Sequence, residues 1–172
     1  MVAYATTCSY TASIMPRDTP AQADELRRLM QKLFRRFGAL AADATPCGKP
    51  LSMAYAHALM VLLAKGEISQ QELGAELCID KSNVARLSAR MVESGHIEQR
   101  PNEKDGRSRL LSLTTKGTRL AREVDASSGA RFGSLLSALP QTSRRRVLKS
   151  LDELIISLDR LPAVDGSERK SR

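Results

Sequence analysis

The side chains with the clearest chemistry lie close together between residues 81 and 90. They are of the types that contact base edges and phosphates in duplex DNA. Asn pairs with adenine, Arg or Lys with guanine, and Ser with either. If Val84, Leu87 and Met91 face a core, these polar side chains fall on or beside the exposed side of one helix. The pattern favours a surface that binds duplex DNA, and the alternative is a helix face that is merely solvated. The reading residues are Lys81, Ser82, Asn83, Arg86 and Arg90.

A second group of cations follows in a polar segment that contains a glycine. Lys104, Arg107 and Arg109 lie within residues 101–109, between a short extended run and a short apolar run. A flexible charged hairpin of this size suits a minor groove, whose negative potential attracts arginine. The whole chain carries 27 Lys and Arg against 19 Asp and Glu, a net charge of +8, which also favours polyanions.

The rest of the composition argues against an enzyme or a metal protein. Cys8, Cys47 and Cys78 are scattered and form no CxxC pair, and the chain has only two histidines to join them at a metal site. This favours a reducing compartment, with no disulfide framework and no cofactor. The longest apolar stretch, residues 54–64, is too short to span a bilayer, so a soluble cytoplasmic protein is expected. We find no Gly-rich phosphate loop and no Ser/His/Asp set with acid and base in reach.

Two short capped helices must position the reading residues. Ser69 and Glu72 have the spacing of a capping box, which starts a helix that ends near Cys78. Asp80 caps the next helix, which ends at Gly95. Two such helices joined by a short turn predict a helix–turn–helix, with Cys78 in an apolar turn position and in the core.

A β-hairpin is predicted after this pair of helices. Its strands are the extended run at 96–100 and the apolar run at 110–113, which flank the charged segment. Apolar residues at spacings of three and four predict the other helices. These are residues 20–42, 52–65, 115–138 and 140–161.

The last helix carries apolar residues in alternating steps of four and three, which is a heptad seam. Such a seam is too apolar for the surface of a monomer, so it favours pairing with a second copy of the chain. The alternative is that it packs only on residues 20–42 of the same chain. The seam consists of Val147, Leu151, Leu154, Leu158 and Leu161.

The segment from about residue 52 to 117 resembles the MarR family of regulators. The matching features are a helix ending in Gly, a strand ending in Arg, a wing with Asp-x-Arg, and Leu-Thr-x-x-Gly closing the hairpin. They stand here as Gly95, Arg100, Asp105 to Arg107, and Leu113 to Gly117, and they follow the run Asp80 to Leu87.

The resemblance implies a mainly α-helical fold with a small β-hairpin, in which a winged helix–turn–helix domain joins a helical dimerisation region. It divides the chain into a flexible tail (1–17), an N-terminal dimerisation helix and linker (18–48), a winged helix–turn–helix DNA-binding domain (49–114), C-terminal dimerisation helices (115–161) and a second flexible tail (162–172).

The resemblance also implies a homodimer that binds double-stranded DNA at a palindromic operator, usually as a repressor. Ser69 and Gln70 join the DNA-binding residues already named, and Asp105 holds the wing by pairing with an arginine. Members of the family are commonly released from DNA by small aromatic or phenolic ligands. These bind between the dimer base and the winged lobe, where Tyr55 and His57 would lie.

Two other functions stay open at this point. Some relatives sense oxidants through a thiol, and Cys8 in the tail and Cys47 in a loop are candidates for accessible thiols. A winged protein-interaction module that has lost DNA binding is the alternative from another class. The intact set of Lys81, Asn83, Arg86, Asp105 and Arg107 argues against it.

Overall fold

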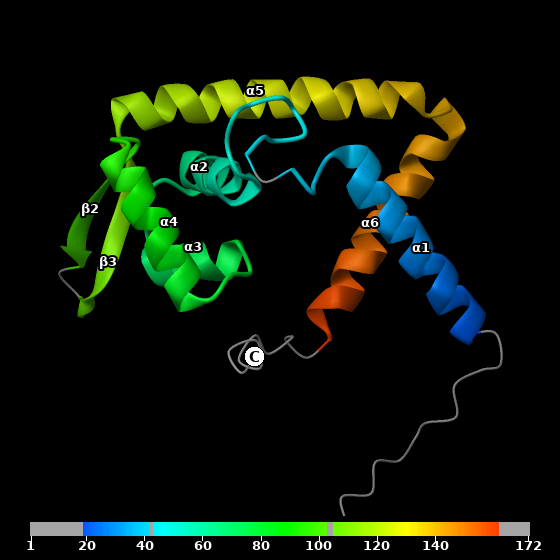
Figure 1. The fold of residues 1–172 in the computed structure, drawn as a ribbon, viewed down its shortest axis with the longest axis horizontal. Coiled ribbons are helices and arrows are strands. Elements are labelled where there is room, and N and C mark those ends of the chain that lie inside the picture. Colours follow the sequence, from blue (N-terminus) through cyan, green and yellow to red (C-terminus); the bar gives the residue numbers. More distant parts are fainter. Residues whose placement is uncertain (1–18, 42, 103–104, 162–172) are drawn as a thin grey trace, which may run out of the picture.

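The computed structural model describes residues 19–41, 43–102 and 105–161, with side chains for all of these except 105–107. This part of the chain forms six helices and one three-stranded antiparallel sheet (Figure 1). The predicted mainly α-helical fold with a small β structure is therefore confirmed. The elements are α1 (Thr19–Phe37), α2 (Met53–Lys65), β1 (Ile68–Ser69), α3 (Gln70–Glu76), α4 (Lys81–Glu93), β2 (Ile97–Asn102), β3 (Asp105–Leu113), α5 (Thr115–Ala138) and α6 (Gln141–Asp159).

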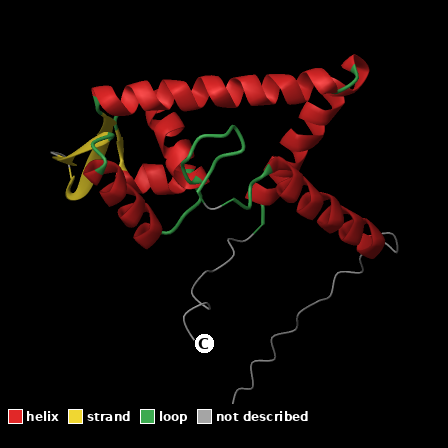
Figure 2. Ribbon diagram, turned by 45° about the horizontal axis from the view of Figure 1, so that its top comes forward, coloured by secondary structure: helices red, strands yellow, loops and turns green. Residues whose placement is uncertain are grey.

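The helix α5 forms a long bar that joins two groups of elements. Helices α2, α3 and α4 and the sheet lie at its N-terminal end, whereas α1 and α6 lie at its C-terminal end (Figure 1). The same separation is visible after rotation in Figure 2. The reading residues thus lie at one end of α5, and the predicted dimerisation helices α1 and α6 lie at the other.

Local side-chain caps set the bounds of the helix–turn–helix, as the sequence predicts. The Ser69 hydroxyl accepts the Glu72 N–H at 3.1 Å, and the Glu72 carboxylate accepts the Ser69 N–H at 2.7 Å, which completes the capping box before α3. The Asp80 carboxylate accepts the Asn83 N–H at 2.8 Å and so caps α4. These caps fix where the exposed face of α4 begins.

The turn between α3 and α4 differs from the prediction at Cys78. Its side chain is exposed, although the sequence predicts it in the core. Cys78 has φ +52°, and this left-handed conformation points its side chain to solvent. The neighbouring Leu77 and Ile79 pack against the core in its place.

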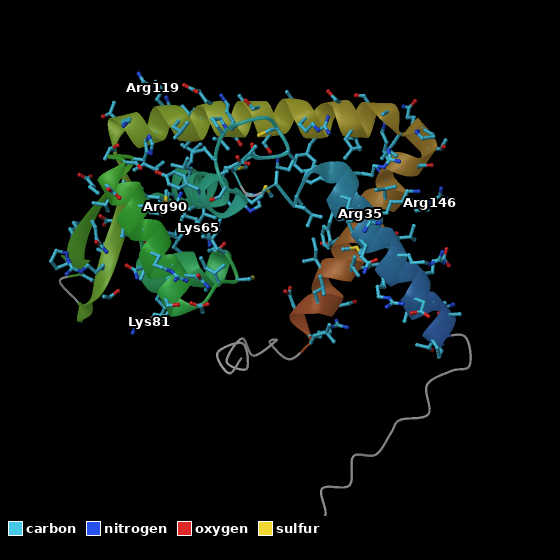
Figure 3. All side chains as sticks on the ribbon, in the orientation of Figure 1. Arg35, Lys65, Lys81, Arg90, Arg119 and Arg146 are labelled. Carbon is cyan, nitrogen blue, oxygen red and sulfur yellow. The ribbon has the colours of Figure 1, made fainter. Side chains whose placement is uncertain are left out.

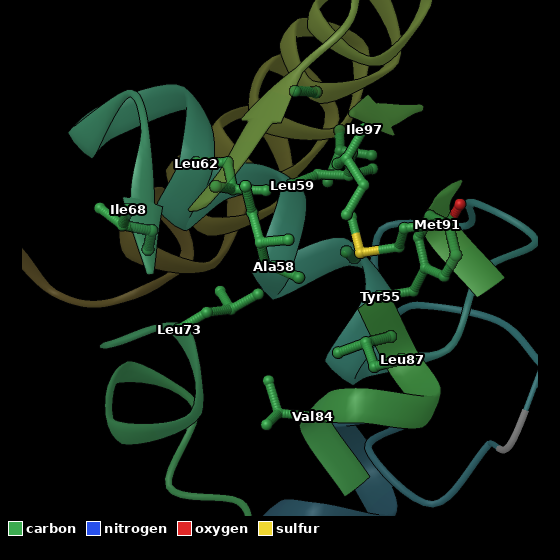
Figure 4. Packing of buried hydrophobic residues seen from close by; sticks show 14 residues of the cluster. Tyr55, Ala58, Leu59, Leu62, Ile68, Leu73, Val84, Leu87, Met91 and Ile97 are labelled. Carbon is green, nitrogen blue, oxygen red and sulfur yellow. The ribbon is translucent and has the colours of Figure 1, made fainter. Parts of the chain in front are cut away.

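One hydrophobic core holds α2, α3, α4 and the sheet together, and we call this unit the head (Figure 4). Leu59, Leu73, Met91 and Leu111 are each fully buried in it and come from four different elements. A buried side chain of this size stabilises the fold by roughly 1.5–3 kcal/mol. Val84, Leu87 and Met91 are the inward face of α4, as the helical spacing predicts, and they turn its polar face to solvent.

The sheet has the order β1-β3-β2, and its hairpin is longer than predicted. Strand β2 extends to Asn102 and β3 begins at Asp105, so most of the segment predicted as a loop is paired, with a register shift between Pro101 and Asn102. Backbone pairing does not need an apolar face in an exposed hairpin, so side-chain alternation gives no signal there. The two-residue strand β1, which pairs Ile68 with Leu111, was also not predicted.

The first helix ends earlier than predicted. The sequence favours residues 20–42, but α1 ends at Phe37 because Gly38 adopts φ +85°. The Phe34 carbonyl accepts both the Gly38 N–H (3.2 Å) and the Ala39 N–H (3.1 Å), which closes the helix. The other predicted helices agree with the structure to within one or two residues, which is the usual precision for helix ends.

The helices α1 and α6 contain no buried residue. Both nevertheless carry large apolar side chains, whose exposed fractions on α6 range from 43% for Ile156 to 57% for Leu148. Large exposed apolar side chains that gather on one surface are typical of interaction sites. The exposed apolar side chains are Leu26, Leu29, Leu33 and Phe34 on α1, and Leu148, Leu151, Ile155, Ile156 and Leu158 on α6.

Candidate nucleic-acid interface

The structure places all five reading residues of α4 on its exposed side. Figure 3 shows Lys81 and Arg90 at opposite ends of this helix. The buried positions Val84, Leu87 and Ser88 lie on the other side, so the polar residues form a continuous surface about three turns long. The reading residues on this surface are Lys81, Ser82, Asn83, Arg86 and Arg90.

A hydrogen-bond network joins four residues at the start of this surface. Oδ1 of Asp80 accepts the Ser82 hydroxyl at 2.7 Å as well as the Asn83 backbone N–H, and Oδ2 accepts Nδ2 of Asn83. Oδ1 of Asn83 in turn accepts Nη2 of Arg86 at 2.6 Å. The hydrogen bond from the Asn83 backbone, followed by that from Ser82, holds the pKa of the Asp80 carboxyl below its usual value.

A groove of about 530 Å³ lies beside this surface, between α3, the start of α4 and β3. Gln70, Lys81, Ser108 and Arg109 contribute its polar walls. Three of these are predicted DNA-binding residues from three separate elements, and the fold brings them to one groove. Ser69 lies next to it, with its hydroxyl already accepting the capping bond.

The other wing residues are described only in part. Arg109 is exposed on β3 and lines the groove together with Lys81. Lys104 and the side chains of Asp105 and Arg107 lie outside the described residues. Their predicted contacts with DNA and within the wing therefore stay predictions.

Two contacts that the sequence did not predict fix the hairpin to the rest of the head. Nε of Arg100 donates to Oε1 of Glu67 at 2.8 Å and Nη2 donates to Oε2, a bidentate pair that lowers the pKa of Glu67. Gln99 on β2 donates to the side chain of Gln70 on α3 at 3.3 Å. These partners are about 30 residues apart in the chain, so no local spacing reveals them.

A junction at His96 joins α2, α4, β2 and α5. The Tyr55 hydroxyl lies 2.7 Å from Nδ1 of His96, and the two rings meet edge to face. Burial, followed by the charge of Lys116, lowers the pKa of His96. Gly117 at the start of α5 lies so close that a Cβ there would be 1.8 Å from the His96 carbonyl oxygen.

The two residues predicted to bind an effector lie in different places. Tyr55 is only 4% exposed and belongs to the junction with His96. His57 lines a cavity of about 50 Å³ between the end of α1, the 45–47 loop, α2 and α5. Cys47 and Arg131 line the same cavity, and Sγ of Cys47 is 3.0 Å from the Thr45 hydroxyl.

This cavity is small for a phenolic ligand. A cavity that holds benzene has a volume of about 150 Å³, so an aromatic ligand needs the walls to move apart. The Phe37 and Phe132 rings, whose centroids are 5.4 Å apart, form part of the wall where α1 meets α5.

The described residues contain no group of three His, Cys, Asp or Glu side chains able to hold a metal ion. Among the described helices, none has the length and apolarity that a membrane crossing requires. The candidate site is the cationic surface of α4 and β3 with the groove between them.

Comparison with known proteins connects this geometry to a family. The MarR family model matches residues 49–108, which run from the start of the head into β3. The HTH-type transcriptional regulator BilQ of Clostridium symbiosum (strain WAL-14163) is 27% identical over 104 residues, covering 60% of this chain and 72% of that protein.

Two solved structures share the fold. A cysteine-to-serine mutant of MarR from E. coli, complexed with operator DNA, has a TM-score of 0.63 at 21% identity and covers 86% of this chain and 100% of that one. BpsR of Bordetella bronchiseptica, whose DNA binding is regulated by 6-hydroxynicotinic acid, has a TM-score of 0.63 at 18% identity, covering 76% and 98%. The head therefore matches the MarR family of transcriptional regulators over residues 49–108, and the described part of the chain shares the fold of these two solved structures.

Proposed function

We propose that this protein is a homodimeric repressor that acts in the cytoplasm and binds a palindromic operator. The observation that carries the proposal is the surface on which α4 and β3 present their cations together. Lys81 and Arg109 line one groove although they are 28 positions apart in the chain. A recognition helix in the major groove with a wing in the adjacent minor groove uses such a surface. Repression is the usual mode of the family.

The apolar surfaces of α1 and α6 support the dimer. A groove of about 320 Å³ lies between α1 and α5 and is lined in part by Leu33, Phe37 and Leu135, whose apolar side chains suit contact with a second chain. On the seam, Leu151, Leu158 and Leu161 are exposed in the single chain, whereas Val147 and Leu154 are half-buried. The exposed positions argue against the alternative that the seam packs only on α1. A two-fold axis through this end of the molecule presents two heads to DNA, with half-sites roughly 10 bp apart.

An effector site is proposed in the cavity beside His57. Arg131 and His57 supply polar groups, and Phe37 and Phe132 supply aromatic walls. This combination suits a small aromatic acid or phenol, the ligand class that the resemblance implies. A panel of such compounds is expected to raise the melting temperature for at least one member, and a flat response for every compound would contradict the effector proposal.

The DNA proposal is tested by titrating labelled duplexes of random sequence with the purified protein at several salt concentrations. Wild type is expected to bind, with log K falling linearly as log salt rises. Arg86→Ala and Lys81→Ala are expected to weaken binding, whereas Arg119→Ala on the outer side of α5 serves as the matched control (Figure 3). An interaction module without DNA affinity predicts no retained duplex even at low salt.

A further inference from the structure

We propose that Asn83 positions Arg86 for base reading and does not itself read a base. This inference rests on the proposed DNA binding and changes the role that the sequence assigns to Asn83. Its basis is the chain of contacts from Asp80 through the Asn83 amide to Arg86. Each end of that amide already has a partner at the start of α4, so its orientation is set by Asp80 and Arg86 before DNA binds.

The polarity of the network allows only one arrangement. A carboxylate accepts hydrogen bonds but cannot donate them, and a guanidinium donates but cannot accept. The amide of Asn83 has one donating and one accepting end, so it satisfies Asp80 and Arg86 only with Nδ2 toward the former and Oδ1 toward the latter. Reading adenine requires one N–H and one lone pair on the same edge of the amide at once, so it would compete with the orientation that these two contacts hold.

The amide is also the bridge that joins two residues unable to meet directly. Asp80 and Arg86 are six positions apart, whereas side chains on a helix meet at spacings of three and four. Asn83 lies three positions from each of them. Asp80 therefore anchors Asn83, and Asn83 anchors Arg86.

Arg86 keeps the donors it needs for DNA. Only Nη2 is bonded to Asn83, which leaves most of the five N–H groups of the guanidinium available. A fork of this kind pairs with O6 and N7 of guanine. Holding the side chain before binding removes part of the entropy cost of ordering it, worth roughly three- to tenfold in affinity for the preferred site.

Asp80 performs two tasks that one substitution separates. A serine at this position can still cap the helix by accepting the Asn83 backbone N–H. It lacks the second carboxylate oxygen that holds Nδ2 of Asn83. Asp80→Ser is therefore expected to keep the thermal stability of the protein and to lose the positioning of Arg86.

The experiment measures the base preference of variants by selecting preferred duplexes from a random pool and then titrating every single-base change in the selected site. Arg86→Ala is expected to lose discrimination at one guanine position in each half-site, by roughly ten- to a hundredfold. Asn83→Ala and Asp80→Ser are expected to lose roughly three- to tenfold at that same position and nowhere else. In the double variant, Asn83→Ala is expected to cause no loss of base discrimination beyond that of Arg86→Ala alone. Gln141→Ala, which removes an exposed amide at the start of α6, is the matched control.

The outcomes separate this inference from the DNA-binding proposal. If wild type selects no sequence from the pool, the proposed function itself fails. If wild type selects a site and Asn83→Ala loses preference at an adenine position that Arg86→Ala leaves unchanged, Asn83 is a reader and the inference is wrong. An unchanged preference in both Asn83→Ala and Asp80→Ser would overturn it as well.

Discussion

At the scale of single residues, Arg109 contributes charge to the groove between α4 and β3. It is exposed and shares this groove with Lys81, where a phosphate backbone would pass. Each phosphate contact releases counterions, so Arg109→Ala is expected to reduce the slope of log K against log salt by about one unit for every DNA sequence. Arg146→Ala on α6 is the control and should leave the slope unchanged. Equal slopes for wild type and Arg109→Ala would remove Arg109 from the DNA contacts.

At Gly117, the junction with His96 leaves no room for a side chain. A methyl group there would lie 1.8 Å from the His96 carbonyl oxygen, which is backbone and cannot rotate away. Gly117→Ala is expected to destabilise the protein by roughly 1–3 kcal/mol or more, the cost of overpacking a core. The measurement is the urea midpoint of unfolding.

A second glycine in the same helix provides the control for Gly117. A Cβ at Gly129 meets no atom within 4 Å, and alanine favours a helix over glycine by about 1 kcal/mol. Gly129→Ala should therefore raise the midpoint. A similar shift in both variants would mean that the close contact with His96 carries no energy.

The sequence correctly predicted the local structure of those residues whose contacts are with near neighbours in the chain. The caps at Ser69 and Asp80 involve bonds across three positions, and so they follow from spacing alone. The exposure of Cys78 depends on its φ angle, which the residue type does not reveal. The burial of Tyr55 against His96 joins positions 41 residues apart, so helical spacing on α2 could not distinguish it from a ligand contact.

At the scale of elements, the junction of α2, α4, β2 and α5 makes stability depend on pH through His96. Burial lowers the pKa of His96 in the folded state below its ordinary value. The unfolded chain thus binds the proton more readily, and stability falls as the pH drops through the ordinary histidine pKa of about 6.5 toward the lower folded value.

Comparison of urea midpoints at about pH 7.5 and about pH 5.5 tests this expectation, because these values lie on either side of the ordinary histidine pKa. Wild type should lose more stability over this range than His96→Gln, which cannot titrate at that position. The carboxyls of Glu67 and Asp80 have lowered pKa values and titrate below this range, so they should not mask the effect. Equal losses in the two proteins would show that His96 is not protonated preferentially in the unfolded chain.

The predicted elements were correct where apolar periodicity or a cap marked them. Helices α2, α4 and α5 have both signals and were located closely. Strand β1 has two residues, too few for any alternation, and the outer part of the hairpin is polar on both faces. Those segments are held by backbone pairing with β3, a partner that a local pattern does not identify.

At the scale of the whole molecule, the proposed dimer requires that a second chain cover α1 and α6. Leu151 lies on the predicted seam and is 44% exposed. Leu151→Glu places a charge where a dimer would bury an apolar side chain, so light scattering should show a monomer and DNA affinity should fall strongly. Gln141→Glu adds the same charge at the start of α6 and should stay dimeric. A dimeric Leu151→Glu protein would place the interface elsewhere.

The sequence predicted a dimer seam, but the structure extends the apolar surface beyond it. Leu148, Ile155 and Ile156 are exposed although they lie outside the heptad positions. A heptad describes one stripe between two helices, whereas the exposed apolar residues of α6 occupy more than one stripe. Which of these residues stay uncovered depends on how the rest of the fold places α6, which only the folded chain reveals.

The most direct test of this account is a hydroxyl-radical footprint of the wild-type protein on a duplex that it selects from a random pool. Two symmetric protected patches are expected on one face of the duplex, with centres about one helical turn, or ~10 bp, apart. Arg86→Ala should weaken both patches together. Absence of protection at a protein concentration that saturates the duplex, or protection without two-fold symmetry, would contradict the claim that paired heads read successive grooves through α4 and the wing.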